Sequence, residues 1–348
     1  MKVLFHIIGW LALALFGLQC KESTMMIVKG EKSYFKAKYK GKITLNATET
    51  AIESIVPDGY LEVRENDKEF SATGNSKGDI VYHLDDHGRS LSQSSEEGRE
   101  FTSGILRDLI TNGFDAEERM YRVHRRGGAR AVLDEINHMK IEPIKGMYFR
   151  YILKNDTFAP ADKKEIAILI DRSMGCSPER ASLLSEYASF FLQEPQSVVP
   201  YLDAVNRICT NTEKTSTLNA ILDQHLSADQ LGQVLSLVGT IETDIERASL
   251  IDKVLDRDSL SGSNFDQSLD LIAGIDAEPD KSGLLIRMAR QNIKTDTQWI
   301  RLIDKTDHLS PDVYRKQVLQ EIARRMPPSL PVTGRYQSSL KALTANEP

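Results

Sequence analysis

The sequence predicts an α+β protein that is predominantly α-helical. We expect a small N-terminal antiparallel β segment followed by a right-handed αα-solenoid of repeats about 34 residues long. Three observations predict this fold. Apolar and polar residues alternate with period two between residues 30 and 100, and the period changes to about 3.6 from residue 101. A basic residue, with an apolar residue six positions before it and a residue that suits a helix start three positions before it, then recurs every 33 to 35 residues from Lys145 to Arg315.

Composition excludes several classes of protein. The chain has 348 residues, of which 41% are hydrophobic and 27% charged, so it is neither intrinsically disordered nor a polytopic membrane protein. A formal net charge of −6 argues against a nucleic-acid partner, because phosphate binding needs concentrated positive charge. Three cysteines are too few for a disulfide-based scaffold.

The first twenty residues have the pattern of an export signal. Lys2 precedes an apolar run from Val3 to Leu18, which is about 24 Å long as a helix and short for a bilayer span. Cys20 follows this run and polar residues follow Cys20, an arrangement that resembles a bacterial lipoprotein signal. The resemblance implies that residues 1–19 are a signal peptide and that Cys20 is lipidated. Ordinary secretion and an uncleaved anchor are the alternatives.

Residues 20–100 are expected to form a small antiparallel β domain preceded by a linker. Tyr60–Glu65 alternates between apolar and charged residues after a Pro57-Asp58-Gly59 turn. Residues 69–73 and 79–84 are expected to pair as a hairpin around Gly74–Gly78. Because a few short strands bury little surface, this sheet should pack against the helices that follow it.

Residues 101–128 are expected to be connecting helices. A first helix spans Phe101–Thr111, and Asn112-Gly113 ends it. Asp115 caps a second helix that runs to Arg126, where Gly127-Gly128 stops it. Residues 327–348 are expected to be a flexible C-terminal tail.

Residues 129–326 carry the repeat. Its recurring basic residues are Lys145, Arg180, Lys214, Arg247, Lys281 and Arg315. Six positions before each lies an apolar residue, and three positions before each lies a residue that suits a helix start. We interpret each unit as two helices, A and B, that bury their apolar faces against neighbouring units. This region broadly resembles tetratricopeptide or HEAT-like arrays, and an irregular helical bundle is the alternative.

Two short motifs invite a catalytic or metal-binding interpretation. Gly74-Asn75-Ser76-Lys77-Gly78 matches the nucleophile elbow of hydrolases, but that elbow needs a helix after the serine, and here a strand is expected. We therefore expect a hairpin turn. His83 and His87 would lie about 13 Å apart on an extended strand, too far to share a metal ion. The sequence predicts no catalytic residue, no metal and no cofactor.

One segment is densely basic and is a candidate surface for an anionic partner. Its arginines are Arg119, Arg122, Arg125, Arg126 and Arg130. On one helix, Arg119, Arg122 and Arg126 share a face. Such a face could contact lipid headgroups or a polyanionic polymer. The alternative is that these arginines form ion pairs with the acidic residues nearby.

Cys176 and Cys209 fall in the A–B turns of adjacent units. Equivalent points in stacked repeats are about 10 Å apart, which exceeds the Cα separation of a disulfide. We therefore expect two buried free thiols. A disulfide formed in an oxidising compartment is the alternative.

Together these features predict a non-enzymatic lipoprotein of the cell envelope. Anchored in the membrane and facing the periplasm or the cell surface, its solenoid would bind a protein or peptide partner. Two alternatives are kept. The first is an envelope sensor or regulatory subunit, and the second is a hydrolase-type enzyme with its site at the β–helical junction near His83, His87 and Arg122.

Overall fold

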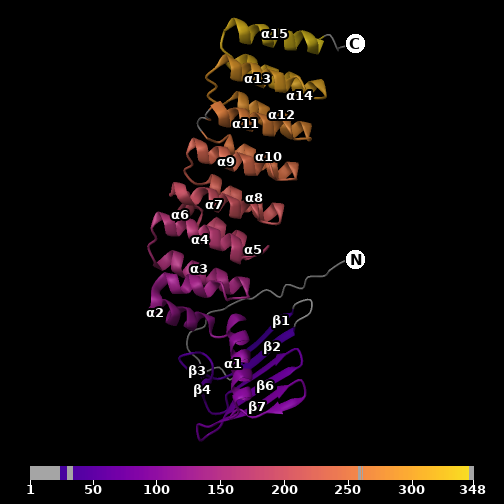
Figure 1. The fold of residues 1–348 in the computed structure, drawn as a ribbon. Helices are drawn as coiled ribbons and strands as arrows, with labels where there is room; N and C mark the ends of the chain where they lie inside the picture. Colours follow the sequence, from indigo (N-terminus) through magenta and orange to yellow (C-terminus); the bar gives the residue numbers. More distant parts are fainter. Residues whose placement is uncertain (1–23, 30–33, 258–259, 261, 345–348) are drawn as a thin grey trace. The chain divides into compact units, whose positions relative to one another are not determined.

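The computed structural model describes residues 24–29, 34–257, 260 and 262–344. The expected signal peptide and Cys20 lie outside these residues. Contacts divide the chain into two compact units, Met1–Glu117 and Glu118–Pro348. The first contains the antiparallel sheet and the second contains stacked helices (Figure 1), so the protein is α+β and predominantly α-helical, as the sequence predicts.

The sheet is a six-stranded antiparallel meander. Its spatial order is β1-β2-β5-β6-β7-β8, and β3 pairs with β4 as a separate ribbon. The strands are β1 (Thr24–Lys29), β2 (Tyr34–Lys40), β3 (Ile43–Leu45), β4 (Ile52–Ile55), β5 (Tyr60–Glu65), β6 (Lys68–Gly74), β7 (Ile80–Asp86) and β8 (Arg89–Leu91). Alternation along the strands places one set of side chains in the core and the other on the opposite face.

Helix α1 (Glu96–Thr111) belongs to the sheet unit and supplies part of its core. Ile105, Leu106 and Leu109 on α1 pack in one cluster with buried residues of the strands such as Leu61 and Phe70. We expected residues 101–128 to connect two domains, but the first unit instead extends to residue 117 because the sheet needs this helix to cover its inner face.

Helix α2 (Ala116–Ile136) is broken in its middle. Gly127 and Gly128 have non-helical dihedrals, with φ of −148° and +62°. The glycine pair therefore ends one helical segment and starts another, as the sequence predicts, because glycine alone adopts positive φ without a steric penalty.

The remaining helices follow one another in A–B order (Figure 1). They are α3 (Glu142–Asn155), α4 (Pro160–Ser173), α5 (Pro178–Glu186), α6 (Ala188–Leu192), α7 (Pro195–Asn206), α8 (Asn211–Leu222), α9 (Ala228–Val238), α10 (Asp244–Val254), α11 (Gly262–Ala273), α12 (Glu278–Ala289), α13 (Asp296–Thr306), α14 (Asp312–Arg325) and α15 (Leu330–Thr344). The A helices α4, α7, α9, α11, α13 and α15 each contact the next in that series. The B helices α3, α5, α8, α10, α12 and α14 do the same. This is the packing of a helical-repeat stack.

The C-terminal segment corrects the sequence prediction. We expected residues 327–348 to be a flexible tail, but Leu330–Thr344 forms α15. Val332 and Leu343 on this helix are buried, and α15 contacts both α13 and α14. Without it, the apolar flank of α13 would face solvent, so α15 acts as a closing helix for the stack.

The recurring basic residues hold one unit to the next. Arg247, near the start of α10, donates to the carbonyl of Ile241 in the turn after its own A helix (3.2 Å) and to that of Gly274 after the next A helix (2.8 Å). Asp244, three residues earlier, accepts from the backbone N–H of Asp276 (2.6 Å). The acid and the base at the start of helix B therefore satisfy orphan backbone groups of the following unit.

Other units repeat this arrangement. Lys145 donates to the Ser173 carbonyl, and Arg315 donates to the Ser339 carbonyl (2.9 Å), each in the next A helix. Lys214 is buried at the same position, and burial lowers the pKa of its ammonium group, which Glu242 partly opposes. The periodic charge is thus a structural link between units.

Candidate binding surface of the helical repeats

The Gly74–Gly78 segment is a hairpin turn, as the sequence predicts. The Asn75 side chain accepts hydrogen bonds from the backbone N–H groups of Lys77 and Asp79, both at 2.9 Å. Gly74 is required for packing, because a Cβ there would lie 2.5 Å from the carbonyl oxygen of Ile55. The segment joins β6 to β7, so no helix follows Ser76 as a nucleophile elbow requires.

His83 and His87 lie at an exposed hairpin end. His83 is on β7, and His87 occupies the turn before β8 with φ of +54°. His87 lies 3.9 Å from Asp67 and 3.8 Å from Asp86. These residues border an open, polar hollow of about 660 Å³. Among the described residues, no three His, Cys, Asp or Glu side chains are grouped closely enough to hold a metal ion.

The arginines of the basic segment have different environments. Arg119 is buried and pairs with Glu135 at 2.6 Å, so it cannot belong to an exposed anion-binding surface. Arg130 is exposed and contacts Glu165 (3.4 Å) and Asp134 (3.7 Å). Arg122 is half-buried. Because α2 breaks at Gly127-Gly128, the five arginines do not share one helical face.

Arg125 and Arg126 are the exposed remainder of this segment. Within the described chain, neither forms an ion pair or side-chain hydrogen bond. Ion pairing therefore accounts for Arg119 and Arg130, while Arg125 and Arg126 keep their charge available to solvent.

A half-buried polar cluster that the sequence did not predict lies beside these arginines. The Nε2 atom of His124 is 2.9 Å from a carboxylate oxygen of Asp156, and its Nδ1 is 3.4 Å from the Tyr151 hydroxyl. The rings of His124 and Tyr151 pack edge to face. His124 and Asp156 are 32 residues apart, close to one repeat, and this spacing is the signal that could have linked them.

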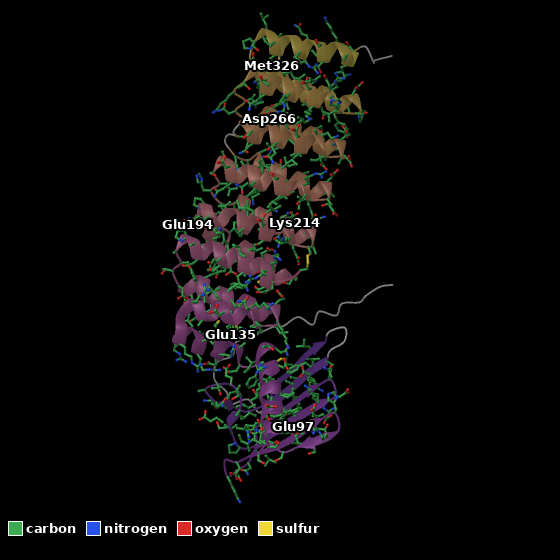
Figure 2. All side chains as sticks on the ribbon, viewed as in Figure 1. Glu97, Glu135, Glu194, Lys214, Asp266 and Met326 are labelled. Atoms are coloured by element: carbon green, nitrogen blue, oxygen red, sulfur yellow. A yellow bond between two sulfur atoms is a disulfide. The ribbon has the colours of Figure 1, made fainter. Side chains whose placement is uncertain are left out.

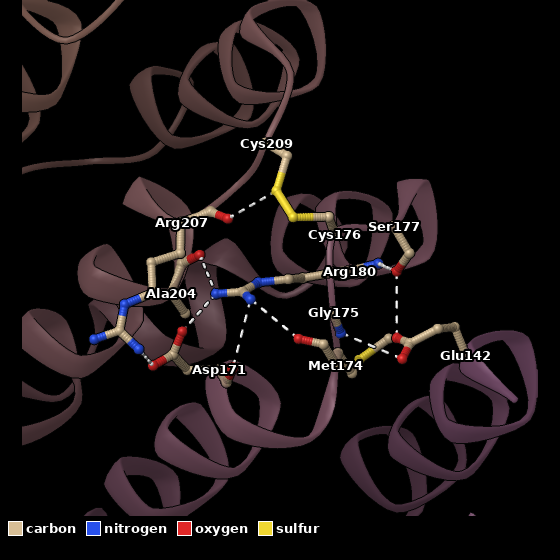
Figure 3. Close-up of a disulfide and its surroundings, with 10 residues drawn as sticks. All are labelled: Glu142, Asp171, Met174, Gly175, Cys176, Ser177, Arg180, Ala204, Arg207 and Cys209. Carbon is tan, nitrogen blue, oxygen red and sulfur yellow. Dashed lines mark hydrogen bonds and ion pairs between the residues drawn. A yellow bond between two sulfur atoms is a disulfide. The ribbon is translucent and has the colours of Figure 1, made fainter. Parts of the chain in front are cut away.

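Cys176 and Cys209 form a disulfide, which corrects our expectation of free thiols (Figure 3). Their Cα atoms are 5.5 Å apart rather than about 10 Å. Both cysteines are exposed and not buried. The bond joins the A–B turns of two adjacent units, α4–α5 and α7–α8.

The buried Arg180 lies close to this disulfide, and its contacts join the same two units (Figure 3). Its guanidinium donates to Asp171 (2.5 Å) and to the carbonyls of Met174 (3.1 Å) and Ala204 (2.7 Å). Asp171 also accepts from the exposed Arg207 at 2.5 Å. Because Ala204 is near the end of α7, this network places the two turns close together and explains the short Cα separation.

The B helices leave shallow grooves between neighbours. The groove between α10 and α12 has a volume of about 380 Å³ and is lined by Ile245, Ala248, Ser249, Gly283 and Leu284, among others. The groove between α5 and α8 has a volume of about 510 Å³ and is lined largely by Ala181, Ser182, Ser185 and Ser216. Another hollow, of about 280 Å³, lies between α2 and α4 and is lined by Leu133, Ile168 and Arg172, among others. Figure 2 shows the side chains along the stack.

Apolar and charged groups border the groove between α10 and α12. Ile245 at the start of α10 is 78% exposed, although large aliphatic side chains are usually buried. Arg287 of α12 donates to Asp252 of α10 at 3.0 Å. An apolar strip closed by a charged pair can hold a side chain of a partner and fix the direction of its backbone.

A second charged site lies at the C-terminal ends of α12 and α14. The carboxylate of Glu321 accepts hydrogen bonds from Arg290 (3.0 Å), Arg325 (2.8 Å) and Arg324 (3.4 Å). The hydrogen bonds from Arg290 and Arg325 lower the pKa of Glu321 to about 2. Arg290 and Glu321 are 31 residues apart, so this site also forms only when two units stack.

Comparisons with protein-family models, curated proteins and solved structures found no match to this chain. In the described residues, no helix has both the length and the apolar composition needed to cross a bilayer.

Proposed function

We propose that this protein is a lipid-anchored scaffold of the bacterial cell envelope whose B helices bind a protein or peptide partner. The observation that carries the proposal is the pair of grooves between successive B helices. Stacked repeats present such grooves along a continuous surface and enclose no deep pocket, and this geometry suits an extended partner better than a small substrate.

The disulfide supports the proposed location. Disulfides persist in oxidising compartments outside the cytoplasm, where thiols are not kept reduced. Cys176 and Cys209 are exposed, so cytoplasmic reductants would reach their bond. The disulfide and the export signal ending at Cys20 are separate features of the chain, and both favour an exported protein.

Site-specific photocrosslinking tests the proposal in cells. A photoreactive amino acid at Ile245 would sit in the α10–α12 groove. One at Val199 would sit on the A helix α7 as a matched control, since both side chains are exposed. We expect the Ile245 probe to capture one discrete envelope protein and the Val199 probe to capture none. Equal or absent crosslinking at the two positions would overturn the proposal.

A further inference from the structure

The outer face of the sheet is unusual at its β1 edge. The inner face packs against α1, so the opposite set of side chains faces away from the core. On β1, the outward residues Met25 and Ile27 are 48% and 49% exposed. Tyr34 at the start of β2 is also exposed, so three large apolar or aromatic side chains lie together at this edge.

Lysines lie directly beside these apolar residues. The antiparallel register pairs Met25 with Lys38 and Ile27 with Lys36. The Lys38 ammonium lies 5.4 Å from the centre of the Tyr60 ring on β5. Lys36 has no ion-pair partner within the described residues. Basic and apolar side chains are therefore interleaved on adjacent strands.

The rest of the outer face differs from this edge. Glu62 on β5 lies opposite Lys38, and Arg64 pairs with Glu69 of β6 at 3.3 Å. Farther along, Ser71 and His83 face each other on β6 and β7. Acidic and neutral polar groups thus balance the charge beyond β5, while β1 and β2 present an apolar and basic strip.

We propose that the β1–β2 face, formed by Met25, Ile27, Tyr34, Lys36 and Lys38, binds the headgroup region of an anionic lipid bilayer. Lysines are attracted to anionic headgroups, aliphatic side chains enter the boundary with the acyl chains, and tyrosine is favoured at that boundary. This inference extends the proposed lipid anchor, since Thr24 is four residues after Cys20 and a chain of four residues spans at most about 14 Å. An anchor at Cys20 would therefore hold this strip at the membrane surface.

Vesicle flotation of the unlipidated mature chain, residues 20–348 with Cys20→Ser, tests this face without the anchor. The vesicles contain phosphatidylcholine, either alone or mixed with anionic phosphatidylglycerol. We expect salt-sensitive binding to the mixed vesicles only. The double variant Lys36→Glu/Lys38→Glu should bind at least about thirtyfold more weakly, because two attractive charges become repulsive. Met25→Ser/Ile27→Ser should also weaken binding.

A matched control changes the far end of the same sheet. Lys77→Glu/Val81→Ser alters one lysine and one exposed aliphatic residue without touching the β1–β2 face, and should bind as the parent does. Equal binding by all variants, or no binding by the parent, would overturn the proposal. A dimer lost in the Met25→Ser/Ile27→Ser variant, with no vesicle binding, would show that a second copy covers this face.

The outcomes separate this inference from the proposed anchor. If the wild-type protein is membrane-bound through a lipid at Cys20 but the unlipidated chain binds no vesicles, the anchor survives and the β1–β2 face does not bind lipid. If the unlipidated chain floats with anionic vesicles but Cys20 carries no lipid in cells, the β1–β2 face binds lipid and the proposed anchor is wrong.

Discussion

Replacing Arg180 with methionine should strongly destabilise the helical unit. The Arg180 side chain is only 5% exposed and donates to Asp171 and to the carbonyls of Met174 and Ala204. Methionine fills much of the same volume but donates no hydrogen bond. The variant therefore removes the Arg180 donor from three backbone carbonyls, those of Asp171, Met174 and Ala204, and from the Asp171 carboxylate.

The magnitude follows from these contacts. Removing one partner of a buried ion pair costs about 3–5 kcal/mol, because the other charge stays desolvated. Arg207 still neutralises part of the charge on Asp171, so we expect the lower half of that range, about 3–4 kcal/mol. Arg207 provides the matched control. Its side chain is 66% exposed, and Arg207→Ala should cost at most about 1 kcal/mol.

Urea unfolding followed by circular dichroism at 222 nm gives both free energies, with the disulfide oxidised in every sample. We expect Arg180→Met to lower the unfolding free energy by at least about 2 kcal/mol more than Arg207→Ala. Equal losses for the two variants would refute the reasoning, because the buried arginine would then contribute no more than a surface charge.

Three further predictions concern the disulfide, the Glu321 site and the sheet. Cys176 and Cys209 are 33 residues apart, so reduction should lower the unfolding free energy by about 4 kcal/mol, measured by urea unfolding with and without reductant; an unchanged midpoint would contradict this. Because the folded-state pKa of Glu321 is about 2, below the ordinary 4.5, ionised Glu321 stabilises the fold above about pH 4.5, and this contribution disappears as the pH falls toward 2. Solvent screening at the exposed arginines reduces the full effect to about 1–2 kcal/mol. Glu321→Gln should therefore lower the unfolding free energy by that amount at pH 7 and by little near pH 2. A loss that does not depend on pH would contradict the stabilising role of ionised Glu321. Gly74→Ala should destabilise the sheet unit by about 2 kcal/mol in thermal unfolding, because its Cβ would meet the Ile55 carbonyl oxygen, and a neutral substitution would show that the backbone gives way easily.

The repeat was predictable from the sequence, but the structural role of its recurring basic residues was not. The spacing of the basic residues, with an apolar residue six positions earlier and a capping residue three positions earlier, was enough to predict the helix pairs and the start of each B helix. Arg180 and Arg247 donate hydrogen bonds to backbone carbonyls of the next unit, which lie 24 and 27 residues farther along the chain. The sequence marks these arginines as periodic, but only the stacking shows that they are buried and hydrogen-bonded.

The errors came from geometry that depends on neighbouring units. The average spacing of stacked repeats made Cys176 and Cys209 look too distant to bond, because the network around Arg180 brings their turns closer than that average. Residues 327–348 were expected to be a tail, although a stack needs a last helix to cover α13. The Glu321 site was missed because its partner Arg290 lies about one repeat away.

The most direct test of the account is the intact mass of the protein recovered from the membranes of cells that make it, measured without reduction. The account predicts a chain that begins at Cys20, carries a lipid there, and contains the Cys176–Cys209 disulfide. A mass that corresponds to the whole 348-residue chain with three free thiols would contradict export, lipidation and the disulfide together.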